Sequence, residues 1–275
     1  MRADLFLHIN SYAESRQKAQ TLIKSGAVRI DGVSVTKPSA EVDESVPHEV
    51  VITTEEKYVG RGGLKLDGAL KAFEIAPCGM ICADIGASTG GFTDCLLQNG
   101  AKKVYAFDSG KGQLHPKLVN DPRVVSKEGF NARYIKLCDV GEAVDIAVMD
   151  VSFISQTMII PSLVSIIKDG GSLVSLVKPQ FEAGRAALGK NGIVKNSKDR
   201  YVAALRVLES AEEVGLSCVG FIRSPIKGGD GNEEYLIHLI KSPYETDRLV
   251  WRERVKSITM KTEKEVKINR DSYSE

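Results

Sequence analysis

The run DIGASTGGFTD, residues 84–94, constrains the fold of this chain more than any other segment. A short apolar strand leads into a glycine-rich turn and then a helix, and glycine lets the backbone approach a ligand closely, with N–H groups free at the helix start. The G-x-x-x-G-G spacing is neither the G-x-G-x-x-G of a dinucleotide site nor the G-x-x-x-x-G-K-[ST] of a phosphate loop. An acidic residue before the turn and no lysine after it favour S-adenosyl-L-methionine, a cofactor that carries no phosphate. A tight turn with a purely structural role is the alternative.

From Cys78 onward, strand-like segments alternate with helical ones, which predicts an α/β, Rossmann-like fold with an open, mostly parallel sheet. Ligands of such sheets bind at the carboxyl ends of the strands. We expect helical structure over residues 154–171, in which Pro161 starts or kinks part of the helix, and another helix through residues 197–215. The expected strands lie at residues 80–86, 102–108, 123–125, 144–153, 172–179, 217–226 and 233–240.

The first 57 residues have a different organisation, typical of a small α+β domain. Ser15 can cap a helix that ends at Gly26, and Asp31-Gly32 between β-rich triplets is a strong hairpin signal. Charge is segregated: five basic and two acidic residues give +3 over residues 1–30, whereas residues 41–56 hold six acidic residues and no Lys or Arg. An ordinary solvated surface is one interpretation. A basic helix followed by a hairpin also suits a phosphate backbone.

Composition narrows the choice of partners. The formal net charge of +1 shows no overall basicity, so nucleic acid would have to bind a local patch. No apolar run is long enough to span a membrane, and the N-terminus lacks the apolar core of a signal peptide. The five cysteines form no C-x-x-C pair and the four histidines show no metal-ligand spacing. We therefore expect a cytoplasmic protein without a membrane segment or a metal site.

Four charged residues stand where an open α/β sheet places its active site. Lys65 precedes the first expected strand of the sheet, Asp150 and Lys178 end strands, and Glu234 opens the last one. Two lysines and two carboxylates meeting in one cleft would form a proton-handling site. Each could instead be an ordinary charge at the rim of the sheet. Charges next to apolar runs are costly, however, unless they are used or paired.

Several motifs resemble those of the hemolysin A (TlyA-like) family of ribosomal RNA ribose methyltransferases, whose catalytic half is related to the FtsJ-type 2′-O-methyltransferases. They include RGGLKLDGAL, DIGASTGGFTDCLL, DVSFIS, LVKPQFEAGR and SPIKGGDGNEEYL. The first fifty residues resemble the S-four-type (αL) RNA-binding domain. The resemblance implies S-adenosyl-L-methionine-dependent 2′-O-methylation of a cytidine in ribosomal RNA. It also implies a catalytic tetrad at Lys65, Asp150, Lys178 and Glu234, and RNA contacts from Arg2, Arg16, Lys18, Lys24 and Arg29.

The chemistry of this reaction suggests a role for each member of the tetrad. A ribose hydroxyl must lose its proton as it attacks the methyl group, and a lysine can accept that proton only when neutral, a form that a nearby cation and partial burial favour. We expect Lys178 to be this base, with Lys65 as the second cation. Asp150 would orient Lys178, and Glu234 would hold Lys65 or the ribose. Much of the rate should come from positioning the two substrates.

The cofactor contacts expected on the same grounds follow the strand ends. Asp84 would hold the amino group of the methionine part, Asp108 the ribose hydroxyls, and Glu128 and Asn131 would lie near the adenine. A turn or capping role is the alternative for each of them. The glycine-rich turn would lie beside the methionine part, through Gly86, Ala87, Ser88, Gly90 and Gly91. After Asp108 the chain has Lys111, where the family usually has an aromatic residue.

These interpretations give four regions: an RNA-binding domain at 1–57, a linker at 58–64, a methyltransferase domain at 65–242 and a charged tail at 243–275. We expect the tail to form a frayed surface helix that docks through Leu249, Val250 and Trp251. The expected partner is ribosomal RNA or a ribosomal subunit, and the sequence does not select the subunit or the nucleotide. Two other functions remain open, a non-catalytic RNA-binding assembly factor and a membrane-active hemolysin.

Overall fold

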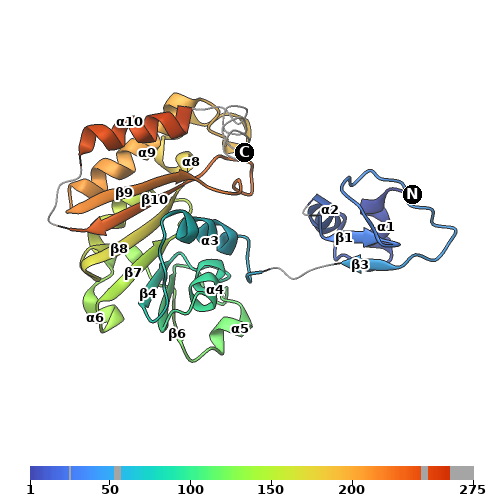
Figure 1. Ribbon diagram of the computed structural model, residues 1–275, viewed down its shortest axis with the longest axis horizontal. Helices are drawn as coiled ribbons and strands as arrows, with labels where there is room; N and C mark the ends of the chain where they lie inside the picture. Colours follow the sequence, from blue (N-terminus) through green and yellow to red (C-terminus); the bar gives the residue numbers. More distant parts are fainter. Residues whose placement is uncertain (25, 53–56, 243–246, 261–275) are drawn as a thin grey trace, which may run out of the picture. The chain divides into compact units, whose positions relative to one another are not determined.

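The computed structural model describes residues 1–24, 26–52, 57–242 and 247–260, which belong to two compact units, Met1–Glu56 and Lys57–Glu275. The N-terminal unit has helices α1 (Ala3–Ile9) and α2 (Arg16–Lys24) and an antiparallel sheet in the order β2-β1-β3. Its strands are β1 (Val28–Ile30), β2 (Val33–Ser34) and β3 (Val50–Ile52). Figure 1 shows α1 and α2 beside this sheet.

The local signals in the N-terminal sequence explain these elements. Ser15 Oγ accepts the N–H of Lys18 at 3.1 Å, so it caps α2 as predicted. Asp31 and Gly32 both have positive φ, 51° and 76°, which is the type I′ geometry that matches the twist of a hairpin. The predicted helix and hairpin are therefore confirmed.

The second unit is built on a seven-stranded sheet in the order β6-β5-β4-β7-β8-β10-β9. The strands from β6 to β8 are parallel, and β10 runs antiparallel to both of its neighbours. This arrangement confirms the predicted fold class, a mostly parallel Rossmann-like sheet. The strands are β4 (Ile81–Ile85), β5 (Lys103–Asp108), β6 (Val124–Glu128), β7 (Val144–Met149), β8 (Ile167–Val177), β9 (Leu216–Arg223) and β10 (Tyr235–Lys241).

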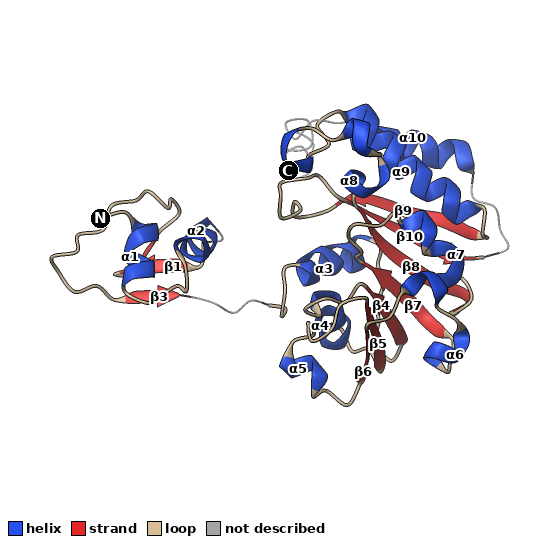
Figure 2. Cartoon of the chain, turned by 180° about the vertical axis from the view of Figure 1, so that it is seen from behind, coloured by secondary structure: helices blue, strands red, loops and turns tan. Residues whose placement is uncertain are grey.

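Helices cover both faces of this sheet (Figure 2). Strands that are buried on both faces have nearly continuous apolar sequences, as these strands do. Side chains of α3 and α4 pack with Cys82 and Val174 on one face, and side chains of α7, α9 and α10 pack with Ala83 and Leu173 on the other. The helices are α3 (Gly62–Ala72), α4 (Gly91–Gln98), α5 (Pro116–Val119), α6 (Leu137–Val140), α7 (Ile160–Leu163), α8 (Pro179–Glu182), α9 (Ser197–Glu212) and α10 (Arg248–Met260). Short 3₁₀ turns are η1 (Ala132–Tyr134), η2 (Gln156–Met158), η3 (Arg185–Ala187) and η4 (Lys190–Gly192).

The helix expected over residues 154–171 is wrong in its extent, although Pro161 does stand in the first turn of a helix, α7. The segment forms η2 and the short α7, and β8 already begins at Ile167. Ile167 is 1% exposed and belongs to the core between the sheet and the helices. Burial in the sheet therefore decides the structure of this residue, and the helical pattern of the apolar run before it does not. An apolar run without clear periodicity does not distinguish a buried strand from a buried helix.

The segment 58–64, expected to be a linker, is part of the second unit. Tyr58 is 3% exposed and packs in the core formed with α3 and α4. The N–H of Val59 donates to the carboxylate of Asp94 in α4 at 2.9 Å, and α3 already begins at Gly62. The segment therefore does not act as a connection between the two units. Its glycines instead allow close packing, since a Cβ on Gly63 would lie 2.3 Å from the ring of Tyr58.

Of the three residues expected to dock the C-terminal helix α10, only Trp251 does so. Leu249 and Val250 are 73% and 59% exposed, whereas Val255 is fully buried against the core and Trp251 packs partly against it. Helical spacing explains the change, because the docking residues lie one turn apart along one face. Within the described residues no helix is both long and apolar enough to cross a bilayer. The rest of the expected tail, residues 261–275, lies outside the described residues.

Candidate functional site

The sheet brings the four predicted tetrad residues to one edge. Asp150 and Lys178 directly follow β7 and β8, and Glu234 directly precedes β10. Because β10 is antiparallel to β8 with Tyr235 opposite Val177, Glu234 stands next to Lys178. Lys65 comes from the first turns of α3. The reversed direction of β10 is what allows a residue at the start of a strand to join residues at the ends of two others.

The four side chains form two short ion pairs. Lys65 Nζ lies 2.5 Å from Glu234 Oε2, with side chains 10% and 3% exposed. Lys178 Nζ lies 2.6 Å from Asp150 Oδ1 and donates to Ser152 Oγ at 2.8 Å. Removing charges from water is costly unless they are paired and hydrogen-bonded. The tetrad is therefore a compact and mostly buried group of two lysines and two carboxylates.

Two glycines let the backbone pack closely against tetrad residues, Gly86 against the main chain of Asp150 and Gly228 against the carboxylate of Glu234. A Cβ on Gly86, which has φ +83°, would lie 2.6 Å from the carbonyl oxygen of Asp150. A Cβ on Gly228 would lie 2.6 Å from Glu234 Oε1. Any larger residue at either position would displace the segment that carries a tetrad residue.

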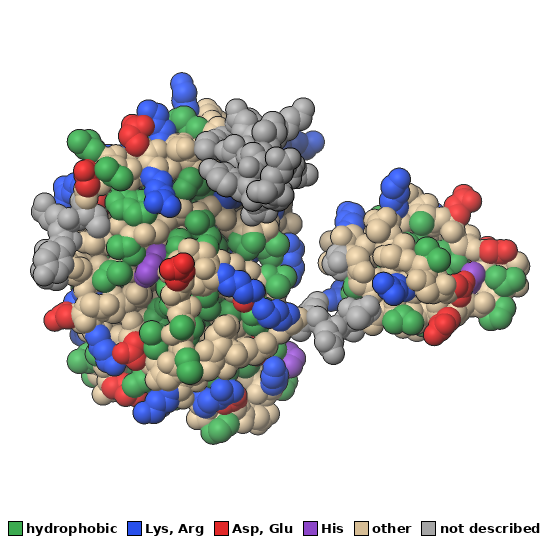
Figure 3. Space-filling view, in the orientation of Figure 1, with side chains coloured by type: hydrophobic (Ala, Val, Ile, Leu, Met, Phe, Trp, Pro, Cys, Tyr) green, Lys and Arg blue, Asp and Glu red, His purple; other side chains and the backbone are tan. Residues whose placement is uncertain are grey.

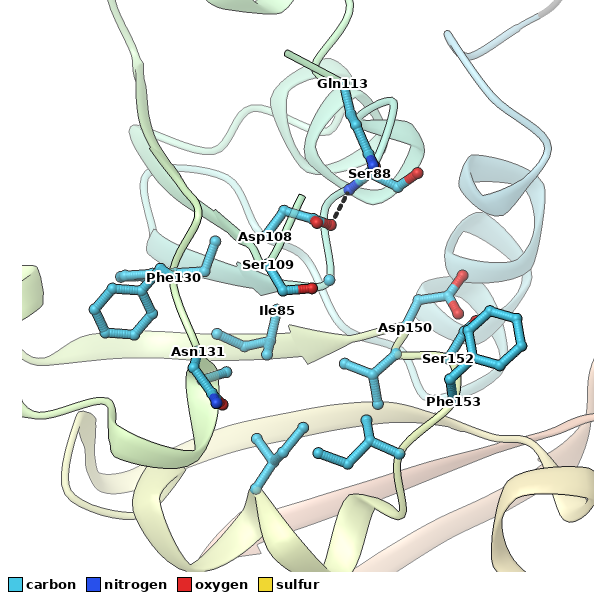
Figure 4. A pocket seen from close by; sticks show the side chains of 16 residues that line it. Ile85, Ser88, Asp108, Ser109, Gln113, Phe130, Asn131, Asp150, Ser152 and Phe153 are labelled. Carbon is cyan, nitrogen blue, oxygen red and sulfur yellow. Dashed lines mark hydrogen bonds between the residues drawn. The ribbon is translucent and has the colours of Figure 1, made fainter. Parts of the chain in front are cut away.

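Two adjoining pockets meet at Asp150 and Ser152. The larger, about 390 Å³, has Asp108, Phe130 and Asn131 toward one end and Asp150, Ser152 and Phe153 toward the other (Figure 4). The smaller, about 230 Å³, is lined by the glycine-rich turn together with Asp150, Ser152 and Lys178. Of the described residues, no lysine or arginine lines the larger pocket. An acidic pocket with an apolar floor suits a cationic ligand without phosphate.

The residues predicted to hold a cofactor divide between these two pockets. Asp108 lines the larger pocket and accepts the N–H groups of Ser88 at 2.7 Å and Gly110 at 2.6 Å (Figure 4). Asn131 lines the same pocket. The turn residues Gly86 and Ser88 line both pockets, and Ala87 and Gly91 line the smaller one. Gly90 lines neither and caps α4 with φ +96°.

Besides Gly90, two predicted cofactor residues, both acidic, lie outside both pockets. Glu128 accepts the N–H groups of Gly112, Gln113 and Leu114, the first at 2.6 Å, and these bonds lower the pKa of its carboxyl. It therefore shapes the loop from which Gln113 reaches the pocket. Asp84 is fully buried, accepts the hydroxyl of Thr93 at 2.7 Å, and burial raises the pKa of its carboxyl to about 7. Its Oδ1 has no hydrogen-bond partner within the described part of the chain.

Sequence reasoning missed the loop after Asp150. Ser152 binds Lys178, and Phe153 is 92% exposed although its φ of 63° is rare for a bulky residue. The ring of Phe153 lies 5.2 Å from that of Phe181, which in turn lies 6.0 Å from Lys178 Nζ. The motif DVSFIS could have pointed to this loop, but nothing in the sequence predicts the positive φ or the exposure.

In the N-terminal unit, Asp4 gathers two of the predicted RNA-binding residues. Its fully buried carboxylate accepts from Arg2 Nε at 3.0 Å, Arg16 Nε at 3.1 Å and Gln20 Nε2 at 2.6 Å. The hydrogen bond from Arg2 is the main reason that the pKa of Asp4 lies far below its usual range. Both arginine side chains remain about half exposed, 47% and 49%. They can therefore still contact a ligand.

The remaining basic residues of this unit do not join that cluster. Lys18 lies two positions after Arg16, roughly 200° around the helix axis. Lys24 ends α2, and Arg29 is exposed on β1. On the face of this unit seen in Figure 3, basic side chains gather toward one side and acidic ones toward the other. The charge segregation noted in the sequence is thus retained on the folded surface.

Known proteins match both units. Residues 58–241 match the FtsJ-like methyltransferase family and residues 1–46 the S4 domain. The 16S/23S rRNA (cytidine-2′-O)-methyltransferase TlyA of Mycobacterium tuberculosis is 45% identical over 86% of this chain and 89% of its own length. Hemolysin A of Brachyspira hyodysenteriae is 46% identical over 87% of this chain and all of its own length. A solved hemolysin structure from Streptococcus thermophilus aligns with a TM-score of 0.75 at 41% identity, covering 98% of each chain.

Proposed function

Because the chain belongs to the TlyA (hemolysin A) family of FtsJ-like methyltransferases with an S4 domain, we propose that it methylates the 2′-hydroxyl of a cytidine in ribosomal RNA. The methyl donor in this proposal is S-adenosyl-L-methionine. The observation that carries it is the Lys178–Asp150 pair, which stands where the two pockets meet.

The larger pocket has the chemistry that this cofactor requires. Its lining holds the carboxylates of Asp108 and Asp150 together with apolar side chains. Asp108 would bind the ribose hydroxyls, Phe130 and Asn131 would flank the adenine, and Gly86 and Ser88 would hold the methionine part. When bound, the cofactor supplies an electrophilic methyl group on a sulfonium. The carboxylate of Asp150 favours that positive charge at the junction of the pockets.

Lys178 is the group that handles the proton of the ribose hydroxyl. Its Nζ is held from one side by Asp150 and from another by Ser152, so it is oriented before RNA arrives. In its neutral form it would hydrogen-bond the 2′-oxygen and accept the proton of that hydroxyl, which leaves the oxygen able to attack the methyl group that the bound cofactor would supply. Lys65, held by Glu234, would supply the positive charge near Lys178 that favours the neutral form of that base. Most of the acceleration would come from this alignment.

Phe153 and the N-terminal unit contribute to RNA binding in this proposal. An exposed aromatic ring beside the tetrad can stack on an unstacked base, as proteins that bind single-stranded RNA commonly do. The paired guanidiniums of Arg2 and Arg16 suit the phosphate backbone, because arginine presents several N–H donors in a fixed plane. The basic side of the N-terminal unit would thus bind the RNA, and the tetrad at the ends of the strands would modify it.

The direct test compares Lys178→Ala with Lys168→Ala. Lys168 belongs to the same strand, β8, but pairs with Asp145 at the opposite edge of the sheet, so it is a matched control. We expect Lys178→Ala to abolish transfer of tritiated methyl groups to ribosomal RNA while cofactor and RNA affinities stay close to those of the wild type. Lys168→Ala should retain full transfer. Unchanged transfer by Lys178→Ala would disprove the mechanism.

Mapping 2′-O-methyl groups on 16S and 23S rRNA from a strain lacking the protein would identify the nucleotide and the subunit. A site that is lost in that strain and restored by the wild-type gene, but not by the Lys178→Ala gene, supports the enzyme. If no methyl group is lost, and the purified wild-type protein binds RNA without transferring methyl groups, the chain is instead a non-catalytic RNA-binding factor.

A further inference from the structure

Glu182, the last residue of α8, carries a buried carboxylate that the proposed reaction does not use directly. The residue is 1% exposed, and burial raises the pKa of its carboxyl. Ser155 Oγ donates to one carboxylate oxygen at 2.5 Å, and the N–H of Gln156 donates to the other at 2.8 Å. Within the part of the chain that the structure describes, no lysine or arginine forms an ion pair with it, and Arg206 donates instead to its backbone carbonyl. Such a carboxylate is costly to bury, which calls for a reason.

The partner of Glu182, Gln156, is itself fixed from the other side. It is 1% exposed, and its side chain donates to the carbonyl of Leu176 at 2.5 Å and accepts the hydroxyl of Ser175 at 2.8 Å. Both of these residues lie in β8, the strand that leads directly to Lys178. The end of the loop after Asp150 is thus tied to the element that carries the proposed base.

Two segments are therefore joined at both ends. One is the loop 150–156, and the other is the segment 178–182, whose short helix starts directly after Lys178. At the near end Lys178 binds Asp150 and Ser152, and at the far end Glu182 binds Ser155 and Gln156. The exposed Phe153 lies between these two attachments.

From this arrangement we propose that Glu182 is a positioning residue. Its carboxylate holds the loop 150–156 so that Asp150 and Ser152 orient Lys178 and Phe153 stays exposed beside it. This inference rests on the proposed function, because it concerns the same site.

A glutamate suits this position for a geometric reason. Its two oxygens accept one hydroxyl and one backbone N–H at the same time, and an alanine would leave both donors buried without an acceptor. A glutamine keeps one oxygen for the N–H of Gln156, and its amide nitrogen can donate to Ser155 Oγ. A shift of about 1 Å in a positioned group is enough to reduce a rate about 100-fold.

The experiment measures the single-turnover rate of methyl transfer to ribosomal RNA with the full-length protein at saturating cofactor and RNA. We expect Glu182→Ala to lower this rate about 100-fold. Glu182→Gln should restore it to within about 5-fold of the wild type, since about one hydrogen bond is weakened. Ser155→Ala keeps Glu182 and removes one of the two groups that donate to its carboxylate. This variant should lower the rate about 5- to 10-fold. That variant decides the question if Glu182→Ala does not fold.

Asp145→Ala is the matched control for a purely structural effect. Asp145 accepts the N–H of Ile81 at 2.8 Å and pairs with Lys168, so it too is a carboxylate that ties segments together, but at the opposite end of β7. It should lower thermal stability and leave the rate unchanged. The positioning role is refuted if Glu182→Ala, or Ser155→Ala in its place, reacts as fast as the wild type, or if Asp145→Ala slows the reaction as much. A wild-type protein that transfers no methyl group would refute the proposed function itself.

Discussion

Removing one charge of the Lys65–Glu234 pair should destabilise the second unit more than removing both. The ion pair is 2.5 Å long, with side chains 10% and 3% exposed. Lys65→Met leaves the carboxylate of Glu234 buried without its partner, which costs about 3–5 kcal/mol. Lys65→Met/Glu234→Leu removes both charges, and such replacements are often neutral or stabilising by about 1–4 kcal/mol. The double variant should therefore recover the stability of the wild type but not methyl transfer.

Lys71 supplies a control in the same helix. It pairs with Asp67 at 2.9 Å, but its side chain is 72% exposed, so Lys71→Met should cost less than about 1 kcal/mol. The difference in destabilisation between Lys65→Met and Lys71→Met comes from the burial of the two side chains, because the substitution and the helix are the same. For the single variant at Lys65 the loss corresponds to a fall of about 6–20 °C in Tm.

The assay is guanidinium unfolding followed by tryptophan fluorescence. Trp251 is the single tryptophan of the sequence and lies in α10, so the signal reports the second unit alone. Methyl transfer is measured on the same preparations. A double variant as unstable as Lys65→Met would show that attraction within the pair outweighs the cost of burying it. A double variant that still transferred methyl groups would remove the pair from the mechanism.

Three further outcomes follow from the structure. Arg16→Glu should weaken RNA binding and reduce the slope of log affinity against log salt by about 1, whereas Lys18→Glu should change both less; equal effects in a binding titration would contradict the cluster around Asp4. The pKa of Asp84 is raised to about 7 by burial, so its contribution to stability is largest at low pH and is lost as pH rises from about 4 to 7; unfolding midpoints of Asp84→Asn across this range should show a smaller decline than those of the wild type. Phe153→Gly should raise the unfolding free energy by about 1 kcal/mol, since glycine tolerates a φ of 63°, while lowering the methylation rate, and a calorimetric scan with a rate measurement checks both.

The fold could be predicted because local and global signals agree in this chain. The short apolar runs before Asp84 and after Lys103 favour buried strands because of their length and flanking turn residues, and the glycine-rich turn between them indicates a βα unit. The prediction for residues 154–171 failed because the apolar residues of this segment suit either a helix or a buried strand. Packing in the sheet decides where α7 ends and β8 begins. The linker expected at residues 58–64 is wrong because Tyr58 and Val59 contact α3 and α4 through packing and a hydrogen bond to Asp94, and these contacts join residues far apart in sequence.

The site was predictable in its residue types but not in its supporting contacts. Strand ends place Asp150 and Lys178, and the reaction that the family resemblance implies suggested that Asp150 orients Lys178 and that Glu234 holds Lys65 or the ribose. The structure contains the pairs Lys178–Asp150 and Lys65–Glu234. The contribution of Glu182 depends on a loop whose course is set by side-chain hydrogen bonds far apart in sequence. No periodicity or motif carries that information.

The position of β10 between β8 and β9 also determines when the site can form during synthesis. β9 is made first but has no partner in the sheet until β10 inserts between it and β8. A nascent chain that ends before residue 234 holds Lys65, Asp150 and Lys178 but lacks the carboxylate that pairs with Lys65. Domains generally fold as units as they emerge from the ribosome. This domain is completed by β10, the last strand along the part of the chain that the structure describes. Each molecule would therefore acquire a complete site only after most of its chain has left the ribosome that makes it.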